Sequence, residues 1–152
     1  GDVYKRQVSA ILLGPATGAL LLAAAEEGGK ALSVLFSSGR VEPIKAGASA
    51  GLAYATLGYL SMVGAAGSQD RLAWLLALLP LLAAFPVHAA GSGLVGLAAS
   101  RRRALAAPAL AAAVGLNLAW KLAGPLVSIP SLAICLLVRR GVERAEGELI
   151  RF

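Results

Sequence analysis

The sequence predicts an all-α protein, a polytopic transmembrane bundle of four to five helices. Alanine and leucine dominate the 152 residues with 33 and 29 copies, and aromatic residues make up only 5%. Both dominant residues favour helices, whereas β-branched and aromatic residues favour strands. Charged residues make up 14%, against roughly 25% in a soluble domain. The chain therefore has too few charges to cover a surface that faces water.

Charge-free runs long enough to cross a bilayer are the third observation. There are five of them, at residues 8–25, 46–69, 72–100, 104–120 and 122–138. A hydrocarbon core about 30 Å thick needs about 20 apolar residues of helix, with roughly 17 as the lower limit. We therefore predict a transmembrane domain over residues 8–138, with spans at about 8–25, 46–67, 72–99, 104–120 and 122–138.

The net charge of +6 and the pI of about 10.1 fit a membrane topology better than a nucleic-acid-binding surface. Basic residues lie at the ends of the apolar runs, as positive-inside topology requires, and do not form a basic face. We expect the lipid bilayer as partner and no nucleic acid. The single cysteine, Cys135, excludes an internal disulfide and a cysteine metal cluster, and we interpret it as a packing residue.

The first run begins at an artificial junction. Asp2–Gln7 (DVYKRQ) matches the in-frame translation of a transposase sequencing adapter, so we interpret residues 1–7 as non-native and the chain as a fragment. Val8–Ala25 follows as an apolar span. The sequence EEGGK comes next, and with the turn residues up to Lys45 it predicts a solvated loop in which Glu26 and Glu27 face water.

The second run is a simple span, whereas the third is too long for one. Residues 72–100 form 29 residues of uncharged chain, about 43 Å as a helix. Tilt absorbs part of this length. Alternatively, Pro80, Pro86 or the Gly91-Ser92-Gly93 sequence kinks or ends the helix. The triple arginine at 101–103 then stops the run.

The fourth and fifth runs are separated only by Lys121 and the Gly124-Pro125 pair. One straight helix over residues 104–138 would be about 52 Å long, which is too long for one span. Two short helices that turn near Trp120-Lys121 fit better, because Trp and Lys favour the water interface. Residues 139–152 form a charged tail, which we read as a helix extension that grazes the membrane.

Counting basic residues gives an orientation. With the triple arginine inside, ten basic residues are cytoplasmic, at positions 30, 40, 45, 101–103, 139, 140, 144 and 151. With Lys5 and Arg6 set aside as non-native, only Arg71 and Lys121 are then outside. The positive-inside rule predicts a cytoplasmic C-terminus in a bacterial inner membrane. The fragment would begin outside, which suggests that one upstream helix has been lost.

Three polar residues in the apolar runs are candidates for a polar path: His88, Asn117 and Lys121. An ionisable group in hydrocarbon usually faces the bundle interior or a cavity. Asn117 and Lys121 are four residues apart, so they share a helix face. The alternative is structural, with His88 at the headgroups, Asn117 bonded to a neighbouring helix and Lys121 reaching the surface. No acidic residue lies within the runs to partner His88, which favours the structural alternative for it.

Two small-residue pairs indicate helix packing. Gly14 and Gly18, and likewise Gly47 and Gly51, are four residues apart and form a flat strip where backbones approach closely. We expect packing within the chain, with a homo-oligomer or hetero-oligomer interface as the alternative.

No soluble-type catalytic, metal or nucleotide motif is present in the sequence. We therefore expect no enzyme activity, no cofactor and no metal site. The first hypothesis for function is a membrane assembly or structural subunit. The alternative is part of a small-solute transporter or channel, with His88, Asn117 and Lys121 along its path.

Overall fold

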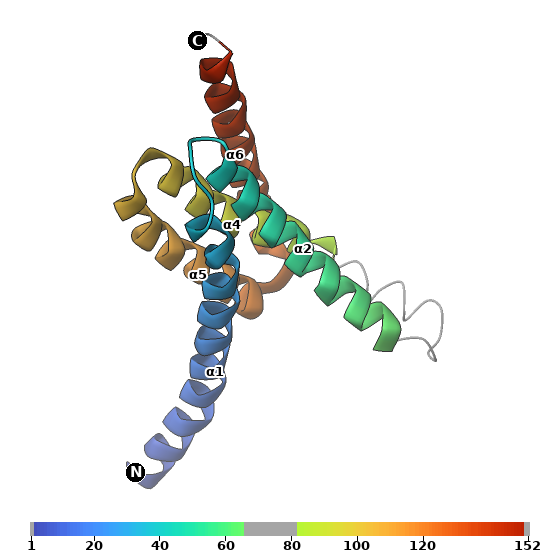
Figure 1. Ribbon diagram of the computed structural model, residues 1–152. Helices are drawn as coiled ribbons and strands as arrows, with labels where there is room; N and C mark the ends of the chain where they lie inside the picture. The colour runs from blue at the N-terminus through green and yellow to red at the C-terminus, as the bar shows by residue number, and fades with distance from the viewer. Residues whose placement is uncertain (1, 66–81, 151–152) are drawn as a thin grey trace.

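The computed structural model describes residues 2–65 and 82–150, and within these ranges the chain is helical with no strand (Figure 1). The all-α prediction is confirmed. The elements are α1 (Asp2–Leu35), α2 (Glu42–Ala65), α4 (Ala84–Arg101), the 3-10 helix η1 (Arg103–Leu105), α5 (Ala106–Ala123), the 3-10 helix η2 (Gly124–Val127) and α6 (Ser128–Leu149).

Helix α1 does not end where the first apolar run ends. It continues through Glu26, Glu27 and Lys30 to Leu35, so the predicted solvated loop is wrong for these residues. Glu and Lys are good helix formers, and the two glycines at 28 and 29 weaken a helix without ending it. The turn comes later, between residues 36 and 41, where Gly39 adopts a φ of 79°.

Helix α4 begins at Ala84, and the earlier part of the long third run, with Pro80, lies outside the described residues. Pro86 lies in the first turn, where a missing N–H costs nothing. The Gly91-Ser92-Gly93 sequence does not end α4, which continues to Arg101. Its small residues instead make room for neighbours, since a Cβ on Gly93 would lie 2.9 Å from the side chain of Val138 on α6.

The connection between α5 and α6 lies three residues beyond the predicted turn. Helix α5 passes through Trp120 and Lys121 and ends at Ala123. Gly124 then takes a φ of 67°, which residues with a side chain rarely adopt, and Pro125 follows within η2. The turn therefore depends on the backbone conformation that glycine can adopt at position 124. Lys121 remains part of α5.

Glycine residues set the crossing of α2 and α4. A Cβ on Gly47 would overlap the carbonyl group of Ser92, one on Gly51 the carbonyl group of His88, and one on Gly96 the carbonyl group of Pro43. The two backbones are therefore in direct contact. In contrast, Gly14 and Gly18 on α1 have open space where a side chain would be.

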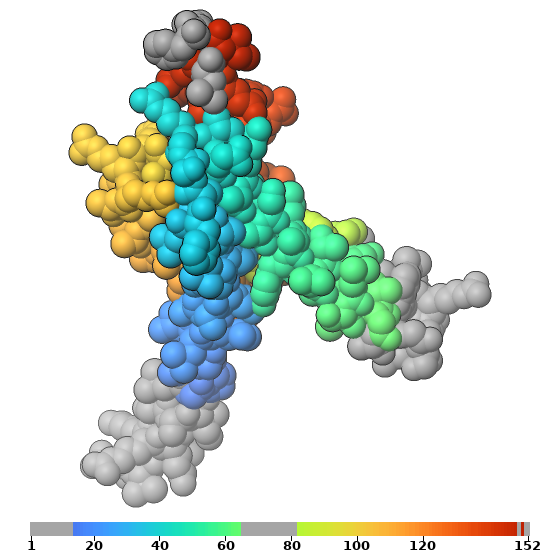
Figure 2. Space-filling view, viewed as in Figure 1, coloured from blue at the N-terminus to red at the C-terminus, as the bar shows by residue number. Residues whose placement is uncertain are grey.

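The distribution of apolar side chains is the reverse of that in a soluble bundle. Alanine and valine form the compact core, which consists of Ala31, Val34, Val95, Ala99, Ala109 and Ala113. Large apolar side chains lie outside, among them Leu21, Leu22, Leu57, Leu60, Met62, Ile129, Leu132 and Leu136. Figure 2 shows α2 running outward from the packed centre with much of its surface uncovered in this view. Where such side chains form a contiguous patch, the patch marks contact with a membrane or a partner.

One helical stretch of the described residues, 103–148, is long and apolar enough to cross a membrane, although it includes the turn at Gly124. The prediction of several spans therefore stays a prediction. Only 11% of the most apolar window of this stretch is buried within the protein. This stretch comprises η1, α5, η2 and α6. Its apolar character is therefore not explained by burial in a core.

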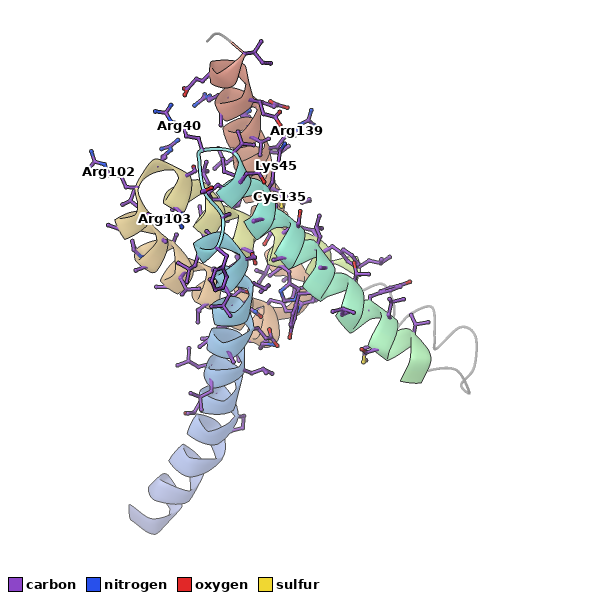
Figure 3. The ribbon with its side chains drawn as sticks, in the orientation of Figure 1. Arg40, Lys45, Arg102, Arg103, Cys135 and Arg139 are labelled. Carbon is purple, nitrogen blue, oxygen red and sulfur yellow. The ribbon has the colours of Figure 1, made fainter. Side chains whose placement is uncertain are left out.

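Basic residues gather where α1, α4 and α6 end and where α2 and α5 begin (Figure 3). Arg103 donates hydrogen bonds to the carbonyl oxygens of Val34 and Ser37 at the end of α1. Arg40 pairs with Glu148, and Lys45 with Glu146 at 2.7 Å. The hydrogen bond to Glu146 raises the pKa of Lys45. Successive helices thus meet at one basic end of the molecule.

The α2–α4 crossing predicts opposite outcomes for two glycines of α2. Gly51→Ala should lower the free energy of unfolding by about 2 kcal/mol, because the added methyl group overlaps the α4 backbone. Gly58→Ala should be neutral or stabilising by up to about 1 kcal/mol, because Gly58 has open space and alanine is the better helix former. Denaturant unfolding in detergent micelles measures both. Equal effects of the two substitutions would rule out the tight crossing.

Candidate functional site

Seven polar residues from three helices meet in the interior, and we call them the polar cluster. The α4 and α5 members are four positions apart, and on α1 Lys30 is four and three positions after two adjacent glutamates, so each set lies on one side of its helix. The members are Glu26, Glu27 and Lys30 from α1, His88 and Ser92 from α4, and Asn117 and Lys121 from α5.

Glu27 is the centre of the polar cluster. Its side chain is 1% exposed and accepts hydrogen bonds from every helix of the cluster. Lys30 Nζ donates to Oε1, as does Asn117 Nδ2 at 2.8 Å, while Ser92 Oγ donates to Oε2 at 3.4 Å. A buried carboxylate is tolerated only when it is paired and hydrogen-bonded, and Glu27 meets both conditions.

His88 contacts the lysine of the cluster. Lys30 Nζ lies 3.0 Å from His88 Nδ1, a hydrogen-bonding distance, and because an ammonium group has only donors, Nδ1 is the acceptor when Lys30 is protonated. The imidazole ring meets the ring of Tyr54 on α2 edge to face, with centroids 5.1 Å apart. Lys30 Nζ also lies 5.0 Å from the Tyr54 ring centroid, a cation–π distance.

Glu26 forms the second half of the polar cluster. Lys121 Nζ lies 3.0 Å from its Oε1, and Asn117 Nδ2 donates to its Oε2 at 2.8 Å. Asn117 therefore joins the two carboxylates through one amide nitrogen. Its own Oδ1 is buried and has no hydrogen-bond partner among the described residues. This acceptor is available to a donor that enters the cluster.

Acidic and basic residues are equal in number in the polar cluster, and exposure is graded across it. Two glutamates pair with two lysines. Side-chain exposure rises from 1% at Glu27 through 9% at Glu26 to 21% at Lys121. In the other direction, toward the basic end, the alanine and valine core follows directly on α1, α4 and α5. The cluster is therefore closest to the surface at Lys121 and closed by apolar packing on the opposite side.

The structure brings all three sequence candidates into this one cluster. Asn117 bonds to α1, and Lys121 is ion-paired rather than free at the surface. His88 is 6% exposed, so it is packed inside the protein. The apolar runs contain no acidic partner for His88, but a residue just after the first run supplies one, because Glu27 Oε1 lies 3.8 Å from His88 Nδ1.

Sequence reasoning missed Glu26, Glu27 and Lys30, because the EEGGK sequence resembles a loop. The useful signal was the i, i+3 spacing of Glu27 and Lys30 between helix-forming alanines and leucines. Cys135 lies apart from the cluster, where its thiol donates to the carbonyl oxygen of Pro86 at 3.4 Å. Within residues 2–65 and 82–150, no group of three His, Cys, Asp or Glu residues is arranged for a metal ion.

Comparisons of this chain with family models, curated proteins and solved structures gave no match.

The Glu27–Lys30 pair should show strong energetic coupling. Removing either partner leaves a buried charge unpaired, which costs about 3–5 kcal/mol, whereas replacing both costs less than the sum. A double-mutant cycle with Glu27→Gln and Lys30→Gln should therefore give a coupling energy of about 2 kcal/mol or more in denaturant unfolding.

The exposed pair Arg139–Glu143 on α6 is the matched control, because it joins the same charge types at 2.8 Å. Its side chains are 74% and 54% exposed, so its cycle should give less than about 0.5 kcal/mol. Similar coupling in the two cycles would contradict the buried arrangement of Glu27 and Lys30.

Proposed function

We propose that this chain is a multi-pass protein of the bacterial inner membrane, with a cytoplasmic C-terminus, that moves protons as part of small-solute transport. The reversed polarity of the fold supports the membrane location. Glu27, Lys30, His88 and Asn117 are buried, while leucines on α1, α2 and α6 are exposed. Lipid solvates the leucines, and the bundle interior shields the charges.

Helix lengths support a position of the polar cluster near the middle of the bilayer. At 1.5 Å per residue, Glu27 lies about 12 Å before the end of α1 at Leu35. His88 lies about 20 Å before Arg101, and Asn117 about 17 Å after Ala106. All three distances are measured from the basic end. In a hydrocarbon core about 30 Å thick, they correspond to mid-depth.

The contacts of Lys30 supply a proton relay. Lys30 Nζ contacts both His88 Nδ1 and Glu27, so a proton can pass from the ammonium group to the imidazole without leaving the cluster. The transfer leaves a neutral amine and an imidazolium, and the net charge is unchanged. Glu27 lies beside both positions of the positive charge and stabilises each. Shared protons of this kind belong to the whole group rather than to one residue.

The exposure gradient supports transport over a static role. Lys121 and Glu26 are 21% and 9% exposed, so the polar cluster comes nearest to the surface at these residues, whereas the alanine and valine core packs on its other side. Alternating access needs a buried ionisable site that communicates with one side of the membrane at a time. The buried, charge-balanced Glu27–Lys30–His88 group is the observation that carries this proposal.

A non-enzymatic structural or assembly subunit is the second candidate. The glycine crossing of α2 and α4 favours it, because direct backbone contact at Gly47, Gly51 and Gly96 makes a rigid pair. In that case the polar cluster fixes the register of the helices and carries no proton. The exposed strip at Gly14 and Gly18 would then be available to another helix.

Proton flux into proteoliposomes separates the two candidates. With the purified chain reconstituted, a trapped pH dye should report proton entry when a potassium–valinomycin potential, negative inside, is imposed. Glu27→Gln should lower the initial rate at least tenfold, because the relay loses its carboxylate. Glu143→Gln, in the exposed pair of α6, should leave the rate unchanged. A wild-type rate equal to that of empty liposomes would defeat the transport proposal and leave the structural one.

A further inference from the structure

We propose that a groove between α4 and α6 at the basic end binds one anionic phospholipid. The groove encloses about 480 Å³ and combines an apolar floor with three arginines. Its principal lining residues are Leu94, Leu97, Leu137, Arg101, Arg140 and Arg144. This inference uses the membrane location proposed above but is independent of the polar cluster and of proton movement.

Two helix faces with the same residue spacing form the groove. Leu94, Leu97 and Arg101 follow one face of α4 at i, i+3 and i+7, and Leu137, Arg140 and Arg144 follow one face of α6 at the same spacing. On both helices the leucines come first and the arginines lie further toward the basic end. The groove is thus apolar at one end and cationic at the other.

Gly141 brings these two faces together. A Cβ on Gly141 would contact the side chain of Leu97, so α4 and α6 approach closely at this point. The contact separates the groove from a second cavity of about 400 Å³ on its other side, which includes Arg40 and Glu148. That second cavity contains an internal ion pair, because Arg40 and Glu148 are bonded to each other.

The arginines of the groove are not ion-paired within the part of the chain that the structure describes. Arg101, Arg140 and Arg144 form no ion pair there, although Arg101 and Arg144 also line the second cavity with Glu148, whereas Arg40, Lys45 and Arg139 each pair with a glutamate of α6. Arginine binds phosphate through several donors at once and is the side chain best suited to it.

Charge and shape together identify the occupant. A phospholipid can place its phosphodiester against the arginines and an acyl chain along Leu94, Leu97 and Leu137. A soluble anion can contact the arginines but leaves the leucines uncovered. Basic pockets between membrane helices on the cytoplasmic side bind acidic lipid headgroups in this way. Phosphatidylglycerol has the required negative charge, whereas phosphatidylcholine has the same chains without it.

Lipid binding to the purified full chain in detergent micelles tests the proposal. Native mass spectrometry should show dioleoyl phosphatidylglycerol bound at least tenfold more tightly than dioleoyl phosphatidylcholine. Arg140→Gln should weaken phosphatidylglycerol binding about fivefold, and Arg140→Lys should restore part of it. Arg139→Gln is the matched control, because this neighbouring arginine is paired with Glu143 and lies outside the groove; it should have no effect.

A second pair of variants tests the apolar end. Leu137→Ala should weaken binding and Leu136→Ala should not, because only Leu137 lines the groove. Three results would each overturn the proposal: equal binding of the two lipids, equal effects of Arg139→Gln and Arg140→Gln, or full competition by millimolar inorganic phosphate. Lipid binding in micelles does not depend on proton movement. The result of this assay therefore stands even if the protein proves not to transport protons.

Discussion

The burial of Glu27 is the constraint on which the rest of the structure depends. A carboxylate with 1% of its side chain exposed needs a counter-charge and several donors, and these come from three helices. Lys30 supplies the charge from one turn further along α1, while Ser92 and Asn117 bring α4 and α5 against it. Unpaired, such a group would cost several kcal/mol. The arrangement of α1, α4 and α5 therefore follows from satisfying one side chain.

The glycines of α2 and α4 complete this arrangement. Because Gly47 and Gly51 carry no side chain, α2 lies directly on the backbone of α4 at Ser92 and His88, the two α4 members of the polar cluster. This contact also places Tyr54 against His88 and Lys30. Polar groups and small residues, rather than large apolar side chains, thus hold the centre together. Leucines remain available for the exterior, where a bilayer would receive them.

The sequence predicted the helical class, because alanine and leucine dominate and charges are few. It also identified His88, Asn117 and Lys121, because single polar residues are conspicuous in apolar runs. It did not predict Glu26, Glu27 and Lys30 in the same site, since two glycines beside charged residues resemble a loop. Their burial depends on partners about 60 to 95 positions away, as with Lys30–His88 and Glu26–Lys121. Local patterns contain no information about such pairs. The turn between α5 and α6 did have a local signal, the Gly124-Pro125 pair, but Lys121 was taken as the turn instead.

Spin-label accessibility tests most directly whether the exterior leucines face lipid around a charged interior. Nitroxides placed singly at Leu57 and Leu132, which are 65% and 54% exposed, would be compared in reconstituted protein with one at Glu148 in the tail. Cys135 would first be replaced by serine. Collisions with oxygen should exceed those with a water-soluble nickel complex at Leu57 and Leu132, and the reverse should hold at Glu148. If the nickel complex collided more often than oxygen with the labels at both leucines, these side chains would face water. That result would contradict a bundle that is embedded in the membrane with its polar residues inside.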